Sequence, residues 1–129
     1  MHQLKRNRRL RANESIRSLV RENHISENDF LVPLFVVEGK GIKEEISSMP
    51  NYFRHSLDTL ESEVKELWAL GLKSVLLFVK IEDRLKDNYA KEAINPKGLM
   101  QRAIMTIKNS CPEMLIMTDV ALDPYSIYG

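Results

Sequence analysis

Three segments of mostly apolar residues alternate with two segments of helical periodicity along this chain. The apolar segments are 30–37, 72–79 and 114–120. The first is almost unbroken, which is typical of a strand buried on both faces of a parallel sheet, and Pro33 within it has no N–H to donate to a ladder. The order strand, helix, strand, helix, strand predicts an α/β fold in which helical crossovers join parallel strands.

The two helices are expected between these strands. Asn95 and Pro96 have the residue types of an N-cap and a first helical position. The earlier helix should begin at Ser56 or Asp58, with Asp58 and Glu61 spaced as a capping box, and end at Gly71. The inner faces repeat with helical spacing: Leu60, Val64, Leu67 and Trp68 in one helix, and Leu99, Ala103, Ile104 and Ile107 in the other.

The first part of the chain is basic and has few apolar side chains. Residues 1–24 contain seven Lys and Arg against two Glu, although the net charge of the 129-residue chain is only +1. We expect 1–24 to form an extended arm with a short helix, 14–22, capped by Asn13, and 25–129 to form the α/β domain. A nucleic-acid arm is one reading of these arginines, but no aromatic residues stand beside them for stacking. An arm that contacts another subunit explains the same residues.

Three strands cannot close a barrel, and a parallel sheet with an open apolar edge is prone to aggregate. The sequence therefore predicts one part of a larger α/β fold. Cys111 is the only cysteine, so no internal disulfide is possible. No apolar run reaches the roughly 18 residues of a membrane span, and no secretory leader is seen, so a cytoplasmic protein without a membrane partner is expected.

In α/β folds the ligand site lies beyond the carboxyl ends of the strands. Asp119 and Asp123 follow the third strand, where they suit Mg²⁺ binding or general acid/base catalysis. Equally, Asp119 suits hydrogen bonds to loop amides and Asp123 the opening of a turn before Pro124. Lys80, after the second strand, is a possible Schiff-base amine, although an exposed loop lysine is the commoner case. The histidines His2, His24 and His55 lack the spacing of zinc ligands.

Five blocks of sequence resemble the opening of the aminolevulinate dehydratase (porphobilinogen synthase) family, in that family's order. They cover nearly the whole chain, and the last of them, Thr118 to Tyr125, is the most specific. The blocks are Arg8–Arg11, Leu31–Gly39, Ile46–Pro50, Asn95–Ala103 and Thr118–Tyr125.

The resemblance implies the N-terminal part of a TIM (β/α)8 barrel, with an arm that embraces a neighbouring subunit in a homo-octamer. It also implies an enzyme that condenses two molecules of 5-aminolevulinate to porphobilinogen for haem biosynthesis. The two Schiff-base lysines of the family match no position of this chain, Lys80 included, so the chain by itself is expected to be inactive. The alternative is a non-catalytic α/β module for oligomerisation, and a nucleic-acid binder ranks last.

The resemblance assigns roles to two carboxylates. Asp119 matches an aspartate that lines the substrate pocket and assists proton transfer, and Asp123 is a second substrate-pocket carboxylate and a candidate metal ligand. Ala121 and Asp123 stand where zinc-using members carry cysteines, which implies a zinc-independent enzyme stimulated by Mg²⁺. Ile127 and Tyr128 depart from the Ser/Thr-His pair that many relatives carry.

Overall fold

A computed structural model gives the structure of the chain and describes residues 7–128. The described residues form a five-stranded mixed sheet with the strand order β2-β3-β1-β4-β5. The three predicted strands are confirmed, and two short strands are added to them. The bounds are β1 Val32–Val37, β2 Lys43–Glu45, β3 Phe53–His55, β4 Ser74–Lys80 and β5 Leu115–Thr118.

The central part of the sheet is parallel, as predicted. β4 pairs with β1 along the whole of β1, from Val32 opposite Val75 to Val37 opposite Lys80, and β5 pairs with the other edge of β4. The crossovers run through α2 (Leu57–Ala69) and α3 (Leu99–Ser110). This is the αβ alternation that the sequence predicts.

The connection 38–55 is more ordered than the polar loop that its composition predicts. β2 and β3 form an antiparallel pair within it, and β3 then pairs in parallel with β1 at Phe35 and Val36. β2 is exposed along its length and consists of Lys43, Glu44 and Glu45. Segments of three residues are too short to show a strand periodicity, which is why the sequence did not predict them.

The helices follow the predicted periodicity but begin differently in detail. α2 begins after Ser56, and Gly71 adopts φ +94° beyond its end, as a helix-terminating glycine does. The capping box proposed for Asp58 and Glu61 does not form. The Asp58 carboxylate instead accepts hydrogen bonds from the Gly41 amide, at 2.8 Å, and from the Ser56 hydroxyl, at 2.5 Å.

The prediction that α3 begins at Asn95–Pro96 is wrong by three residues. Asn95 closes a turn of its own, because its side-chain oxygen accepts from the Lys97 amide and its carbonyl accepts from the Gly98 amide. Gly98 is then the residue that precedes the helix. No helix within residues 7–128 combines the length and the apolar character needed to cross a membrane.

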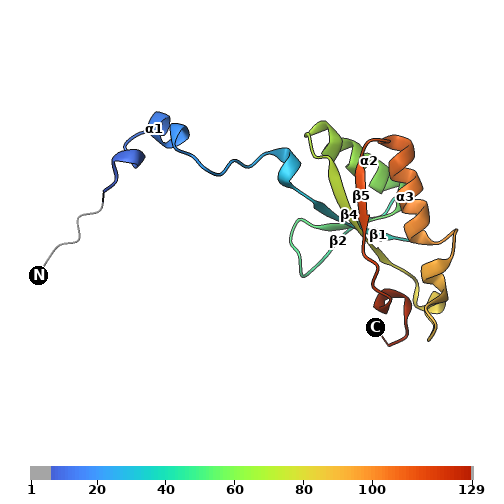
Figure 1. Cartoon of the computed structure of the whole chain (residues 1–129). Helices are drawn as coiled ribbons and strands as arrows, with labels where there is room; N and C mark the ends of the chain where they lie inside the picture. Colours follow the sequence, from blue (N-terminus) through green and yellow to red (C-terminus); the bar gives the residue numbers. More distant parts are fainter. Residues whose placement is uncertain (1–6, 129) are drawn as a thin grey trace, which may run out of the picture.

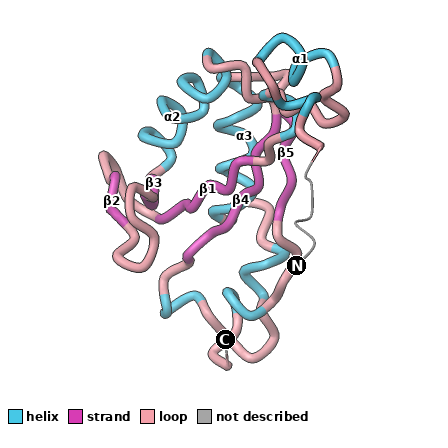
Figure 2. The backbone as a smooth tube through the Cα atoms, turned by 90° about the vertical axis from the view of Figure 1, so that its left-hand side faces the viewer, coloured by secondary structure: helices cyan, strands magenta, loops and turns pink. Residues whose placement is uncertain are grey.

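The hydrophobic core lies between the two helices and one face of the sheet (Figure 2). Alternate residues of the central strands point into this core, so Leu34 and Val36 of β1 are buried while Phe35 between them is only half-buried. The opposite face carries Phe35 stacked on Phe78 of β4, with ring centroids 5.3 Å apart. The buried members of the core include Val75, Leu77, Leu60, Val64, Ala103, Ile107 and Met114.

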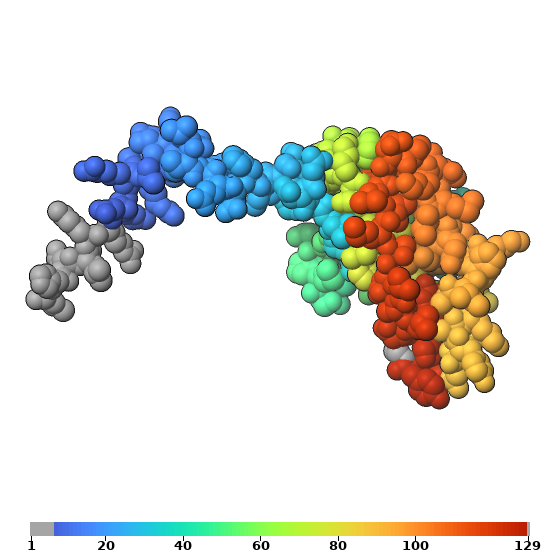
Figure 3. Space-filling view, in the orientation of Figure 1, coloured from blue at the N-terminus to red at the C-terminus, as the bar shows by residue number. Residues whose placement is uncertain are grey.

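The N-terminal arm extends away from the body of the molecule (Figures 1 and 3). Its helix α1 spans Glu14–Leu19, and the Asn13 side chain accepts from the Ile16 amide at 2.9 Å, so the predicted cap is confirmed. The helix ends at Leu19 rather than at residue 22. Residues 1–6 of the predicted arm lie outside the described residues.

Candidate functional site

The carboxyl ends of β1, β4 and β5 lie at one edge of the sheet because the three strands are parallel. Glu38, Lys80 and Asp119 stand at these ends. The structure therefore brings the three sequence-predicted stretches to a common edge. That edge is where α/β proteins place their ligand sites.

Asp119 directly follows β5 and is held by backbone hydrogen bonds. Its amide donates to the Leu77 carbonyl of β4 at 3.3 Å, and its carboxylate Oδ1 accepts from the Ala121 amide at 3.0 Å. The bond from the Ala121 amide is the loop-amide contact that the sequence analysis offered as an alternative to a catalytic role. This bond orients the carboxylate and involves only one of its two oxygens. Asp119 is exposed and lines a cavity of about 290 Å³.

Tyr125 also belongs to this site, although the sequence analysis did not predict it as a site residue. Its side chain is buried and lines the same cavity as Asp119. Burial, and after it the negative charges of Glu92 and Asp119, raise the pKa of the Tyr125 phenol. The Tyr125 carbonyl also accepts from the Asp87 amide at 3.2 Å, which ties the loop after β5 to the loop after β4. The only signal in the sequence was its place in the Thr118–Tyr125 block.

Asp123 opens the single turn Asp123–Tyr125, in which Pro124 occupies an early helical position. This turn is the structural role that the sequence analysis set beside metal binding for Asp123. Its side chain is exposed, and Asp123 does not line the cavity at Asp119. Among residues 7–128, no three His, Cys, Asp or Glu side chains gather in a way that holds a metal ion. These residues alone therefore do not fit a complete Mg²⁺ site, to which Asp123 offers at most one ligand.

Lys80 is the exposed last residue of β4. It lines a separate cavity of about 210 Å³ together with Glu38 and Glu82. After the neighbouring Lys86, it is the second basic group whose charge lowers the pKa of Asp83. Nothing in this setting desolvates its amine, so the structure favours the exposed loop lysine over the Schiff-base reading.

Glu38 forms an ion pair with Arg102 that sequence reasoning missed. Glu38 follows β1 and Arg102 lies in the first turns of α3, so the pair links two elements distant in sequence. The Arg102 Nε also donates to the Lys97 carbonyl at 3.0 Å. Both side chains are partly exposed. We regard the ion pair as a structural contact that holds α3 to the carboxyl end of β1, and not as part of a reaction.

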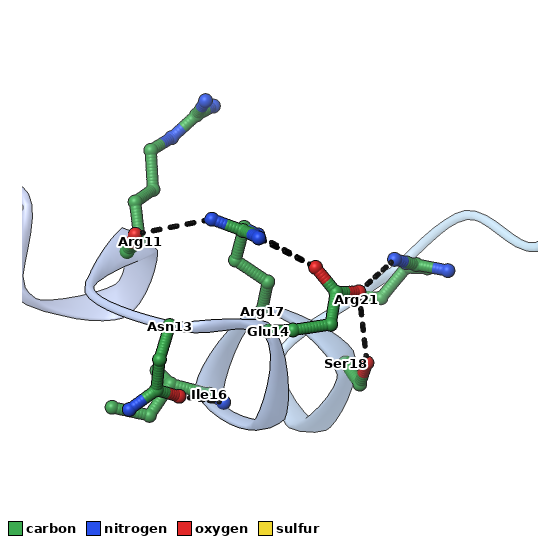
Figure 4. A network of polar contacts seen from close by, with 7 residues as sticks. All are labelled: Arg11, Asn13, Glu14, Ile16, Arg17, Ser18 and Arg21. Carbon is green, nitrogen blue, oxygen red and sulfur yellow. Dashed lines mark hydrogen bonds and ion pairs between the residues drawn. The ribbon is translucent and has the colours of Figure 1, made fainter.

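The arm has its own polar network (Figure 4). The Glu14 carboxylate accepts from Arg17 at 2.6 Å and from Arg21 at 3.2 Å, and the hydrogen bond from Arg17 is the main reason that the pKa of Glu14 is lowered. These contacts lie within the arm itself. The apolar side chains of Leu10 and Leu19 are 60% and 85% exposed, so the described part of the arm, residues 7–24, forms no core of its own.

The comparison with known proteins decides the family. The profile of the family described as delta-aminolevulinic acid dehydratase matches residues 4–129. The chain belongs to the delta-aminolevulinic acid dehydratase family. The resemblance carried by the five sequence blocks is thereby confirmed, and members of this family use metal ions.

Dehydratases of several bacteria are similar to this chain. The delta-aminolevulinic acid dehydratase of Chlamydia pneumoniae is 45% identical over 125 residues, which are 97% of this chain and 38% of that protein. The dehydratase of Synechococcus elongatus is 39% identical over 124 residues, or 96% of this chain and 37% of that protein. The chain thus spans a little over a third of the length of these relatives.

A crystal structure of a dehydratase shows the same fold. The delta-aminolevulinic acid dehydratase of Toxoplasma gondii ME49, solved in complex with its reaction product porphobilinogen, superimposes with a TM-score of 0.90 at 43% identity. The match covers 96% of this chain and 35% of that chain. The α/β fold described above is therefore the N-terminal part of the dehydratase TIM barrel, as the sequence predicted.

Proposed function

We propose that this chain is the N-terminal part of a porphobilinogen synthase, a lyase that condenses two molecules of 5-aminolevulinate. The observation that carries the proposal is Asp119, an exposed carboxylate at the carboxyl edge of the sheet, in a chain that belongs to the dehydratase family. The two Schiff-base lysines expected for the family are supplied outside residues 1–129. The chain alone is then inactive, and its activity appears only in a completed barrel.

Asp119 acts in this proposal as a catalytic and substrate-binding carboxylate. The Ala121 amide holds Oδ1 at 3.0 Å, so the carboxylate is oriented before substrate arrives. The second oxygen is available to accept a proton from the substrate or to return it. The buried Tyr125, tied to Asp87, keeps the loop that carries Asp119 in place.

The experiment joins residues 1–129 to the remaining part of the Chlamydia pneumoniae dehydratase and measures porphobilinogen formation. Asp119→Asn should lower kcat by about 100-fold or more, the range for loss of a general acid/base. Asp83→Asn, at an exposed aspartate on the loop after β4, is the matched control and should stay near the parent rate. Near-parental turnover of the Asp119→Asn protein would refute the role.

For the metal, we propose a zinc-independent enzyme that Mg²⁺ stimulates. Ala121 and Asp123 offer no thiolate, and thiolates are the ligands that favour zinc at such a site. Asp123 contributes one hard oxygen ligand, and the others come from outside the described residues. The bound ion would supply positive charge beside the substrate pocket, and no residue described here depends on it for its position.

The arm is proposed to contact a neighbouring subunit in a homo-octamer, and the completed protein to work in the cytoplasm. The exposed Leu10 and Leu19 and the separation of the arm from the body support a contact with another subunit. Removing residues 1–12 should change the assembly state more than the fold. Analytical ultracentrifugation of the completed protein, beside circular dichroism, tests this, and an unchanged octamer would contradict it.

A further inference from the structure

β2 lies at the outer edge of the sheet and is held there mainly by polar contacts (Figure 2). Its residues Lys43–Glu45 are charged and exposed, and β3 is its only partner strand among residues 7–128. Burial of apolar surface therefore contributes little to its position. Two contacts tie this stretch of chain to α2. The Gly41 amide donates to the Asp58 carboxylate at 2.8 Å, and the Lys43 ammonium donates to Glu63 Oε2 at 3.1 Å.

The same oxygen of Glu63 faces a second basic group. Glu63 Oε2 lies 3.9 Å from His55 Nε2, which is beyond hydrogen-bond distance, whereas Lys43 Nζ lies 3.1 Å from it. Lys43 and His55 are paired opposite each other in β2 and β3, which explains why both reach one position of the helix. A neutral imidazole leaves this oxygen to Lys43, and a charged imidazole competes for it.

Glu63 and Lys43 are the charged groups that act on His55 among the described residues. Burial lowers the pKa of its imidazole; the Glu63 carboxylate raises that pKa in part, and the Lys43 ammonium lowers it. β1 brings no ionisable side chain, and Tyr52, which lines the same cavity as His55, is an uncharged phenol. The other charged groups of the hairpin have partners of their own. These pairs are Arg54 with Glu44, at 3.1 Å, and Glu45 with the Asn51 amide, at 2.9 Å.

Burial decides which basic group takes the oxygen when both are charged. The side chain of His55 is 3% exposed, and its Nδ1 has no hydrogen-bond partner within residues 7–128. A buried charge without a partner is costly, so an imidazolium at this place requires the Glu63 carboxylate. The Lys43 side chain is half-exposed, and its ammonium returns to water at little cost because exposed ion pairs are weak.

We infer that Glu63 is the acceptor of an acid-sensitive switch that controls how firmly β2 is held on α2. While His55 is neutral, Glu63 Oε2 binds Lys43. When His55 takes up a proton, its Nε2–H donates to Oε2, Lys43 returns to solvent, and the outer strand loosens. Ile42 and Glu44 line the cavity of about 210 Å³ at the carboxyl edge, so the loosened hairpin alters one wall of that edge. The inference concerns the hairpin and does not depend on the proposed reaction.

The switch is reciprocal. Protonation of His55 weakens the contact between Lys43 and Glu63, so loss of that contact must favour protonation of His55 by the same factor. Lys43→Gln should therefore raise the pH at which His55 titrates. Lys65→Gln is the matched control, because Lys65 forms its ion pair with Glu61 within α2 and should leave that pH unchanged.

The test uses residues 1–129 joined to the remaining part of the Chlamydia pneumoniae dehydratase. Amide hydrogen exchange is followed by mass spectrometry at pH 7.5 and 5.0, and each rate is divided by the intrinsic rate at that pH. Protection of residues 43–45 should fall about 5-fold or more on acidification, at times when β4 is still unexchanged, as expected of a local opening. His55→Asn cannot take up the proton and should keep residues 43–45 within about 2-fold, whereas Lys65→Gln should show the parent's fall.

The Lys43 variants give a second readout at a half-exposed position, so the test stands even if the buried His55→Asn protein lacks protection in β4. Lys43→Gln should expose residues 43–45 already at pH 7.5, with no further fall at pH 5.0. Deuterium exchange at the Cε1–H of His55, which reports its protonation, should show the rise in its titration. Lys43→Arg keeps the cation and should restore the parent's behaviour. The inference is overturned if residues 43–45 and β4 exchange together, if the folded His55→Asn protein keeps the fall, or if Lys43→Gln leaves both readouts unchanged.

Discussion

Acidification should destabilise the folded chain through His55. Burial lowers the pKa of the His55 imidazole below its usual 6.5; Glu63 opposes this shift and Lys43 adds to it. The unfolded chain therefore takes up a proton near pH 6.5 that the folded chain resists. Stability is complete above that pH and is lost as the pH falls. Between pH 7.5 and 5.5 the loss from one such histidine is at most about 1.4 kcal/mol.

The assay is urea unfolding, followed by the fluorescence of Trp68, the only tryptophan. The window from pH 7.5 to 5.5 keeps aspartates such as Asp58, whose pKa is lowered from 3.8, ionised throughout. His55→Asn and His55→Phe should both flatten the dependence, since neither titrates. His24→Gln, at an exposed position, should leave the slope unchanged. An equal slope in the folded His55 variants, or stability that rises on acidification, would refute the reasoning.

Three further changes test the fold by urea unfolding or hydrogen exchange. Leu60→Ala should cost about 2–5 kcal/mol because Leu60 is fully buried, whereas Leu70→Ala, at the exposed residue that follows α2, should stay within about 0.5 kcal/mol. Gly39→Ala should cost about 1–3 kcal/mol, mainly because Gly39 has φ +127°, a backbone conformation that L side chains rarely adopt, and the end of the Ile42 side chain would also have to move; equal stability would contradict that geometry. Asp58→Asn should speed exchange of the Gly41 amide, which now donates to the Asp58 carboxylate at 2.8 Å, and unchanged exchange would count against that bond.

The main architecture could be predicted because its signals are long and local. Long apolar runs predicted the strands around Leu34 and Leu77, and helical spacing predicted the buried faces of α2 and α3. The hairpin of β2 and β3 could not be predicted in this way. Its strands have three residues each, and they are strands only because β3 finds a partner in β1. Tertiary pairing, not local propensity, decides such segments.

The starts of the helices also differ in whether a local or a distant contact determines them. Asn13 caps α1 through a bond to Ile16, three residues away, and the sequence predicted it. Asp58 looked equally suited to a capping box, yet its carboxylate bonds to Gly41, 17 residues away. A carboxylate that accepts a hydrogen bond from a distant backbone amide is no longer free to cap its own helix. The spacing of residues in the sequence does not show which of the two hydrogen bonds will form.

The position of the candidate site could be predicted from the sequence, but the residues that it holds in place could not. Parallel strands must end at one edge, so the sequence alone placed Asp119 and Lys80 on the same side of the sheet. Which of them is anchored depended on contacts across elements. Asp119 bonds to the backbone of β4 and of its own loop, whereas the side chain of Lys80, the last residue of β4, is exposed. An aspartate whose backbone amide and carboxylate Oδ1 are both hydrogen-bonded keeps its orientation when a ligand arrives, while an exposed lysine must lose side-chain entropy to do so. That difference is the physical reason for proposing Asp119, rather than Lys80, as the catalytic residue in this part of the barrel.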